Sequence, residues 1–263
     1  MRRLLERLTA AVALLVLAPV FVLVALLIWL QDVRSPIYRG TRVGRQGKHF
    51  RMAKFRSMVV GAERTGVRST ASDDDRITPL GHVVRRFKVD ELPQLWNILS
   101  GEMSFVGPRP NVPLEVALYS REELSLLAVN PGVTDFASIV FADEGEILRA
   151  STDPDRDYNL LIRPWKSRLG LHYVAVRSPW VDLQLIVLTA VAMVRRQHAL
   201  LRVQRLLERT GAAADLVQIA GRTQKLVPTV PPGVTLDNWE DHLTVAVRNE
   251  GKRNQVNARP RPQ

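Results

Sequence analysis

The chain has 263 residues and a formal net charge of +11, so it is long enough for one well-buried domain with appendages. The excess of basic residues predicts an anionic partner, and lipid headgroups, nucleotide phosphates or nucleic acid would each fit. Cysteine is absent, which excludes disulfides, iron–sulfur clusters, thiolate zinc sites and a cysteine nucleophile.

The first predicted element is an uncharged segment of 23 residues, from Leu8 to Leu30, long enough to cross a membrane. Basic residues flank both ends, as expected on the cytoplasmic side. Pro19, near the middle, removes one helical hydrogen bond and favours a bend. Each arm would then have about 11 residues and reach about 16 Å, roughly half of the hydrocarbon core. Two arrangements fit the segment: a straight single-pass anchor, and a re-entrant hairpin with both ends on one face.

Two extended runs on either side of the turn at residues 44–47 predict a β-hairpin. Basic side chains are frequent in this hairpin. They would rest on anionic headgroups, each contributing about 1 kcal/mol near the surface, or they form a solvated basic surface. The apolar residues of the two runs are Ile37, Tyr38 and Val43 in the first, and Phe50, Met52 and Phe55 in the second.

A polar segment from Gly61 to Ser72 predicts a loop, and the acidic run 73–75 follows it. Three adjacent acids can help to hold Mg²⁺, although such runs are usually solvated surface. A basic helix through Val83 and Phe87 then carries Arg85 and Arg86 towards a pair of adjacent acids.

That pair, Asp90 and Glu91, precedes Pro93 and an apolar pattern with helical spacing. Acids at a helix N-terminus are stabilised as anions, so both are expected to stay ionised. Two interpretations fit: the acids only complement the helix dipole, or they form a metal-assisted, phosphate-handling site with nearby cations. Those cations are Arg85, Arg86, Lys88 and Arg109.

The whole stretch from Arg85 to Pro110 resembles the signature of the bacterial sugar transferases, the monotopic phosphoglycosyl transferases. A basic run is followed by Asp-Glu-Leu-Pro-Gln-Leu at 90–95 and by Met-Ser-Phe-Val-Gly-Pro-Arg-Pro at 103–110. Residues 42–44, 54–58 and 130–134 resemble further blocks of the family. The chain departs from the pattern at Asp135, where Gly is commonest, and at Ser138, where Gln is common, so the resemblance does not identify the sugar.

The resemblance implies transfer of a sugar 1-phosphate from a UDP-sugar to a polyprenyl (undecaprenyl) phosphate, with release of UMP. It implies that Asp90 is the nucleophile of a covalent phospho-sugar intermediate, and that Asp90 and Glu91 hold Mg²⁺ without a defined division of roles. It also favours the re-entrant hairpin bent at Pro19, on the cytoplasmic face of the inner membrane. The expected phosphate and substrate contacts are Lys54, Arg56, Arg85, Arg86 and Arg109, with Arg109 the leading candidate for bidentate contact.

Downstream, Tyr158 to Tyr173 predicts an amphipathic helix, and Val181 to Val194 is apolar but too short for a second span. The alternation of leucines and arginines from Leu200 to Arg209 predicts a basic amphipathic helix, lying on the membrane or binding a partner helix. Beyond Gly211 the chain becomes polar and contains prolines, and its last dozen residues are expected to be disordered.

Together these elements predict an α+β fold, mainly α, with a re-entrant membrane helix (1–34), a catalytic domain (35–210) and a C-terminal extension (211–263). The catalytic domain contains a small β-hairpin and interfacial amphipathic helices. Membrane lipid is an expected partner and nucleic acid is not. Two alternatives remain: a non-enzymatic membrane adaptor that binds anionic lipid or nucleic acid, and a membrane-bound metal-dependent phosphohydrolase. The adaptor gives no reason for the acidic pair beside Arg109.

Overall fold

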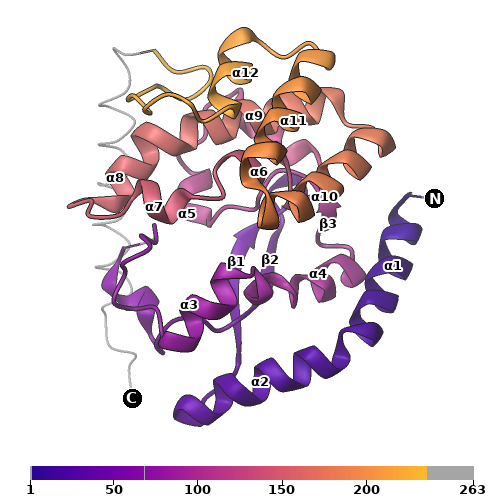
Figure 1. Cartoon of the computed structure of the whole chain (residues 1–263), viewed down its shortest axis with the longest axis vertical. Helices are drawn as coiled ribbons and strands as arrows, with labels where there is room; N and C mark the ends of the chain where they lie inside the picture. The colour runs from indigo at the N-terminus through magenta and orange to yellow at the C-terminus, as the bar shows by residue number, and fades with distance from the viewer. Residues whose placement is uncertain (1, 68, 236–263) are drawn as a thin grey trace, which may run out of the picture.

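The computed structural model describes residues 2–67 and 69–235. Over these ranges the protein is mainly helical, with two two-stranded sheets, which confirms the predicted α+β class (Figure 1). The helices are α1 (Arg2–Val16), α2 (Ala18–Asp32), α3 (Pro79–Arg86), α4 (Gln94–Ser100), α5 (Pro113–Val116), α6 (Phe136–Val140), α7 (Glu144–Ile147), α8 (Pro154–Asp157), α9 (Arg163–Val176), α10 (Pro179–Val194), α11 (Arg196–Arg209) and α12 (Ala214–Ala220), and the strands are β1 (Ile37–Val43), β2 (His49–Phe55), β3 (Ser104–Val106) and β4 (Gly132–Thr134).

The amino-terminal segment forms two helices that bend by 63° where α1 meets α2. The break falls next to Pro19, in the first turn of α2, where a missing N–H and a fixed φ suit a new helix start. In Figure 1 the pair runs along one edge of the molecule, with α2 at the bottom. Among the described residues no individual helix has the length and apolar character of a membrane span, whereas the bent pair together meets both criteria.

The predicted β-hairpin is present, with β1 antiparallel to β2 and Val43 opposite His49 at the turn. Gln46 and Gly47 both have positive φ in that turn, which reverses the chain tightly. Phe50, Met52 and Phe55, the apolar residues of the second predicted run, are all buried. Phe50 and Met52 point to one face of β2 and Phe55 to the other, so both faces of this strand carry buried side chains.

A small core joins the hairpin to the bent helices. Ala10 of α1 is fully buried against α4, and Met103 and the buried side chains of β2 and α4 complete the cluster. Most other side chains of α1 and α2 are exposed although they are apolar. The bent pair is therefore packed against the domain along one side, with ion pairs from Arg2 to Asp182 and from Asp32 to Arg56 near its two ends, and leaves a large apolar surface uncovered.

The parallel pair β3–β4 brings together two segments of the family signature. A Cβ on Gly132 would lie 2.1 Å from the backbone nitrogen of Gly107, so only glycine allows the two chains to approach this closely. Tyr173 supports β3 from behind, because its hydroxyl lies 3.1 Å from the Val106 carbonyl and 2.7 Å from Asp182. This packing fixes the start of the loop that carries Arg109.

The main core lies among α6, α9, α10 and α11. The predicted helix over 158–173 is confirmed, although it begins as a π-helical turn, Tyr158–Ile162, before α9. The helix predicted over Leu200–Arg209 is confirmed as part of α11, but its predicted location was wrong: Leu200, Val203 and Leu207 are buried in the protein's own core. The apolar face of α11 is thus already covered and does not lie on a membrane or a partner.

Residues that follow α11 continue to pack against the domain. α12 lies on α9 and α11, and Thr229 donates a 3.0 Å hydrogen bond to the carbonyl of Leu160. Further along, the carbonyl of Pro232 accepts a 2.5 Å hydrogen bond from the buried hydroxyl of Ser120. The expectation of a disordered end concerns residues outside the described part of the chain.

Candidate active site

A sharp turn between α3 and α4 presents the two acids. Thr78 caps the start of α3 by accepting a hydrogen bond from the Gly81 N–H, and the helix ends at Arg86. Lys88 then adopts a left-handed conformation with φ of 53°, and a 3₁₀ turn, Val89–Glu91, follows. A non-glycine residue with positive φ is strained, so the surrounding structure holds this turn in place.

Glu91 is held by two cations. Its Oε1 lies 2.6 Å from Arg109 Nη2 and 3.1 Å from Lys54 Nζ. Burial alone would raise the pKa of Glu91, but the charges of Arg109 and Lys54 and the Arg109 hydrogen bond outweigh it and keep that pKa well below its usual value. Glu91 therefore stays ionised and organises the cations.

Asp90 has a different environment. It is 8% exposed, its nearest cation is Lys54 at 3.9 Å, and no hydrogen bond from the described residues reaches its carboxylate. Burial raises the pKa of Asp90, Lys54 lowers it in part, and Glu91 raises it further. The two acids lie in the 3₁₀ turn before α4, so the helix N-terminus does not set their pKa values. Burial is the largest influence on the pKa of Asp90, whereas cations hold that of Glu91 down.

The predicted cations divide into two groups. Lys54 and Arg109 join the acids, and burial lowers the pKa of Lys54 and of the neighbouring Lys88. Arg85 acts on Asp90 through its charge without a close ion pair in the described structure. The remaining two lie elsewhere: Arg86 is exposed, with its guanidinium 5.9 Å from the Phe87 ring, and Arg56 donates a 2.6 Å hydrogen bond to Asp32 at the end of α2.

The side chains that follow the acids differ in burial and in hydrogen bonding. Asn97 is buried, accepts from the Ala53 N–H and donates to the Arg51 carbonyl, so it ties α4 to the edge of β2. Gln94 is fully buried, and neither its Nε2 nor its Oε1 has a hydrogen-bond partner in the described structure. Trp96, in contrast, is 60% exposed.

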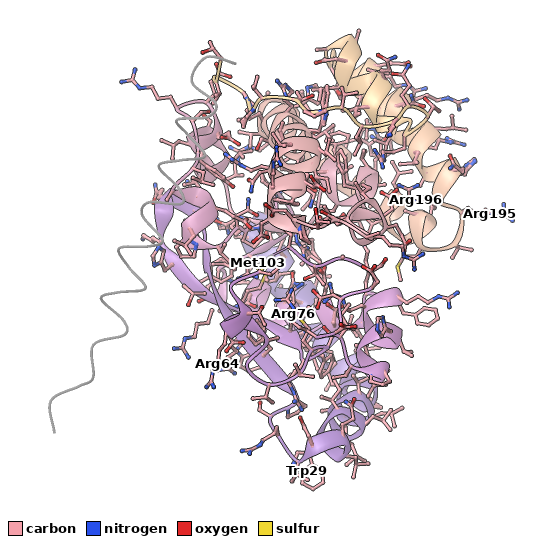
Figure 2. All side chains as sticks on the ribbon, turned by 90° about the vertical axis from the view of Figure 1, so that its left-hand side faces the viewer. Trp29, Arg64, Arg76, Met103, Arg195 and Arg196 are labelled. Atoms are coloured by element: carbon pink, nitrogen blue, oxygen red, sulfur yellow. The ribbon has the colours of Figure 1, made fainter. Side chains whose placement is uncertain are left out.

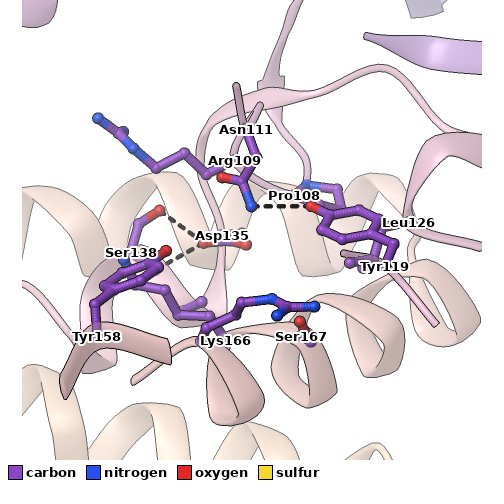
Figure 3. Close-up of a pocket in the computed structure, with 12 residues that line it drawn as sticks. Pro108, Arg109, Asn111, Tyr119, Leu126, Asp135, Ser138, Tyr158, Lys166 and Ser167 are labelled. Carbon is purple, nitrogen blue, oxygen red and sulfur yellow. Dashed lines mark hydrogen bonds between the residues drawn. The ribbon is translucent and has the colours of Figure 1, made fainter. Parts of the chain in front are cut away.

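A small pocket of about 40 Å³ opens beside Arg109 (Figure 3). Its walls include Asp135 at the N-cap of α6, Ser138 of α6, Tyr158 of the π-helical turn and Lys166 of α9. Lys166 also makes an ion pair with Glu144. Sequence reasoning did not single out Lys166 or Glu144, because they are 22 residues apart and no local spacing connects them.

The acidic run 73–75 is engaged in structure. Asp74 pairs with Arg76 at 2.6 Å, and Asp73 accepts a 3.3 Å hydrogen bond from the Ala150 N–H. Within residues 2–67 and 69–235, no group of three or more His, Asp or Glu side chains is arranged to hold a metal ion. Asp90 and Glu91 are two adjacent carboxylates, and Mg²⁺ is commonly bound by one or two carboxylates plus substrate phosphates. The donor set at the acids therefore fits Mg²⁺ with a phosphorylated substrate.

Comparison with known proteins matches residues 1–196 to the family model described as Bacterial sugar transferase. The chain is 38% identical over 193 residues to an undecaprenyl-phosphate glucose phosphotransferase of Komagataeibacter xylinus, which covers 69% of this chain and 34% of the relative. It is 31% identical over 205 residues to a UDP-glucose:undecaprenyl-phosphate glucose-1-phosphate transferase of Caulobacter vibrioides, covering 75% and 71%.

A third relative is named for the transfer of a different sugar. The chain is 30% identical over 190 residues to a UDP-N-acetylgalactosamine-undecaprenyl-phosphate N-acetylgalactosaminephosphotransferase of Aeromonas hydrophila, covering 70% of this chain and 41% of the relative. The chain thus spans less than half the length of the Komagataeibacter and Aeromonas proteins, at 34% and 41%.

Proposed function

Because the chain belongs to the bacterial sugar transferase family, we propose that it transfers a sugar 1-phosphate from a UDP-sugar to a polyprenyl phosphate and releases UMP. Relatives of this kind are named for that transfer with glucose or N-acetylgalactosamine. The product would be the lipid-linked diphospho-sugar that begins synthesis of a surface polysaccharide or glycoconjugate.

The observation that carries the proposal is the unequal environment of the two acids. Glu91 is bound to Arg109 and Lys54, whereas the Asp90 carboxylate accepts no hydrogen bond within the described structure. A carboxylate with free lone pairs, partly buried beside cations, suits a nucleophile. We therefore assign the nucleophile to Asp90 and the positioning of Lys54 and Arg109 to Glu91.

The reaction would occur in two displacements. An oxygen of Asp90 attacks the sugar-linked phosphorus, the bond from that phosphorus to the bridging oxygen breaks, and the bridging oxygen leaves with UMP. An oxygen of polyprenyl phosphate then attacks the same phosphorus, and the bond to Asp90 breaks, which regenerates the carboxylate. Each step brings one anion to a phosphoryl group whose charge Arg109 and Lys54 offset.

Mg²⁺ is part of the proposal. Asp90 and Glu91 would hold it together with the substrate phosphates, and when bound it supplies positive charge next to the pyrophosphate. Arg109 contributes fixed charge independently, because its partner Glu91 raises its already high pKa and keeps the guanidinium protonated.

The placement at the membrane rests on the bent pair α1–α2. Its exposed side chains are predominantly apolar, and Trp29 projects at the bottom end of the molecule, far from Arg195 and Arg196 (Figure 2). We propose that this pair enters the cytoplasmic face of the inner membrane and returns to it, which would place the acids close to the polyprenyl phosphate headgroup. The salt bridge between Arg56 and Asp32 would then anchor the end of α2 to the hairpin.

Nucleotide release tests the proposal. Purified protein is incubated with Mg²⁺, undecaprenyl phosphate and a panel of UDP-sugars, beside the Asp90→Asn variant. The expected result is UMP formation from at least one donor, with sugar passing to lipid, and no UMP from the variant. Free sugar phosphate formed without lipid would instead favour a phosphohydrolase. If the wild-type protein formed no UMP with any donor, this result would contradict the proposed transferase activity.

A further inference from the structure

The pocket beside Arg109 contains a buried carboxylate with one unused oxygen. Asp135 is 1% exposed, and its Oδ1 accepts hydrogen bonds from the Ser138 N–H at 2.7 Å and the Ser138 hydroxyl at 2.6 Å. These bonds cap α6. No hydrogen bond from the described residues reaches Oδ2, and Asp135 lies at the centre of the pocket in Figure 3.

Oδ2 is not among the fully enclosed side-chain atoms that lack a partner in the described structure, so water or a ligand can reach it from the pocket. A ligand that displaces that water must supply a donor in its place, because an acceptor left without one costs free energy. Capping α6 needs only one oxygen, which serine or asparagine would also supply. The Tyr158 hydroxyl, on the same pocket, likewise has no hydrogen-bond partner among residues 2–67 and 69–235. The pocket therefore holds two polar groups whose bonding capacity its own walls leave unused.

The size and position of the pocket limit what can fill it. A cavity needs a volume of about 10–15 Å³ to hold one water molecule. The pocket, with a volume of about 40 Å³, therefore holds a few water-sized groups, but neither a nucleobase nor a whole sugar ring. Arg109 lines the pocket and also binds Glu91 at 2.6 Å, so the pocket adjoins the proposed phosphate site. The group that enters must therefore be the edge of a molecule whose phosphate lies at Arg109.

We propose that Asp135 is a specificity-determining residue that accepts a hydrogen bond from one hydroxyl of the donor's sugar. This inference rests on the proposed function, since it assumes a UDP-sugar at the acids. Ser138 holds Asp135 in place. Burial raises the pKa of Asp135, and the Ser138 hydrogen bonds and the charge of Lys166, which is paired with Glu144, lower it only in part. A sugar that lacks that hydroxyl would leave a buried carboxylate unpaired, which sites of this kind penalise strongly.

The test compares the activity of Asp135 variants and wild type on a set of UDP-sugar donors. Asp135→Ser keeps an N-cap oxygen and removes the second carboxylate oxygen, and Asp135→Asn keeps the shape while replacing an acceptor. kcat/KM for UMP release is measured with the best natural UDP-hexose and with its monodeoxy analogues. Asp153→Ser, which alters the cap of α8 outside the pocket, is the matched control. Thermal unfolding identifies any variant that fails to fold.

The expected result is that one deoxy analogue lowers kcat/KM of the wild-type protein by roughly 10- to 150-fold, the range for a hydrogen bond to a charged group. In Asp135→Ser the same analogue and the parent sugar would react equally, and Asp153→Ser would behave as wild type. Equal losses for every analogue in wild type and Asp135→Ser would overturn the inference. If Asp135→Ser does not fold, the same comparison is decided with Asp135→Asn.

Product inhibition separates the sugar from the nucleotide. UMP is expected to inhibit wild type and Asp135→Ser equally. Weaker inhibition of the variant by UMP, without any change in the discrimination among sugars, would place Asp135 on the nucleotide and overturn the inference. If the wild-type protein released no UMP from any donor, the proposed function itself would fail, an outcome distinct from an active enzyme that is indifferent to Asp135.

Discussion

Arg109 donates a hydrogen bond of 2.6 Å to Glu91, and no equivalent bond from the described residues reaches the adjacent Asp90. Two neighbouring acids in one turn therefore have pKa values that are shifted in opposite directions. The pKa of Glu91 is held well below its usual value, and that of Asp90 is raised by burial. This asymmetry yields predictions of opposite sign for the two positions.

Glu91→Gln is expected to destabilise the protein. The substitution leaves Lys54 and Arg109 beside a neutral amide, and removing one partner of a partly buried charge cluster costs about 2 kcal/mol of the free energy of unfolding. Because the folded-state pKa of Glu91 is depressed, its contribution is complete above the unfolded value of 4.5 and is lost as the pH falls through the folded value. Thermal unfolding in detergent at pH 7 and in acid measures this, and an equal loss at every pH would contradict it.

Asp90→Asn is expected to abolish transfer and to stabilise the fold at neutral pH. The raised pKa means that ionised Asp90 costs folding free energy above that pKa, and the cost disappears as the pH falls below the unfolded value of 3.8. The melting temperature of the variant should therefore exceed that of wild type at pH 7 and match it in acid. A variant that is less stable than wild type at pH 7 would show that the Asp90 carboxylate has a structural partner.

Tyr173→Phe tests the support behind the Arg109 loop. The Tyr173 hydroxyl lies 2.7 Å from Asp182 and 3.1 Å from the Val106 carbonyl, just before the loop begins. Its loss is expected to cost about 1 kcal/mol of stability and to lower kcat. Tyr38→Phe, at an exposed tyrosine of the hairpin, is the control and should change stability by less than about 0.5 kcal/mol. Unchanged unfolding and kinetics in Tyr173→Phe would show that the hydroxyl does not support the loop.

The orientation of α1 and α2 is open to thiol labelling, because the chain has no native cysteine. Arg3→Cys and Arg34→Cys place a thiol near each end of the pair, and Leu23→Cys places one on an exposed apolar position of α2. In inverted membrane vesicles, whose cytoplasmic face is outward, a membrane-impermeant reagent should label both ends and leave Leu23→Cys unlabelled. Labelling of one end only would indicate a single-pass span.

Local features of the chain predicted much of this structure. The hairpin was predicted from two extended runs around the turn at residues 44–47. The bend in the amino-terminal segment lies next to Pro19, where a missing N–H was expected to favour it. The acids and Arg109 were identified through the signature that contains them. These features depend on neighbouring residues, which a sequence displays directly.

Features that depend on long-range packing could not be predicted in the same way. The α11 pattern gives an apolar face, but only the folded structure shows that the domain's own core covers it. Lys54 and Arg56 were both expected at the phosphate site, from the block 54–58 that resembles the family. Instead Arg56 pairs with Asp32, 24 residues away, and Lys54 pairs with Glu91, 37 residues away. The different pKa values of Asp90 and Glu91 likewise follow from burial and from which cations reach each acid.

The central claim, that Asp90 forms the covalent intermediate, is tested most directly by trapping it. Purified protein is incubated with Mg²⁺ and its UDP-sugar, labelled in the sugar-linked phosphate, without polyprenyl phosphate. The account predicts label bound to wild-type protein, located by mass spectrometry on the peptide with Asp90, absent from Asp90→Asn, and released when polyprenyl phosphate is added. An active enzyme that releases UMP only when the lipid is present, and never carries label, would contradict it.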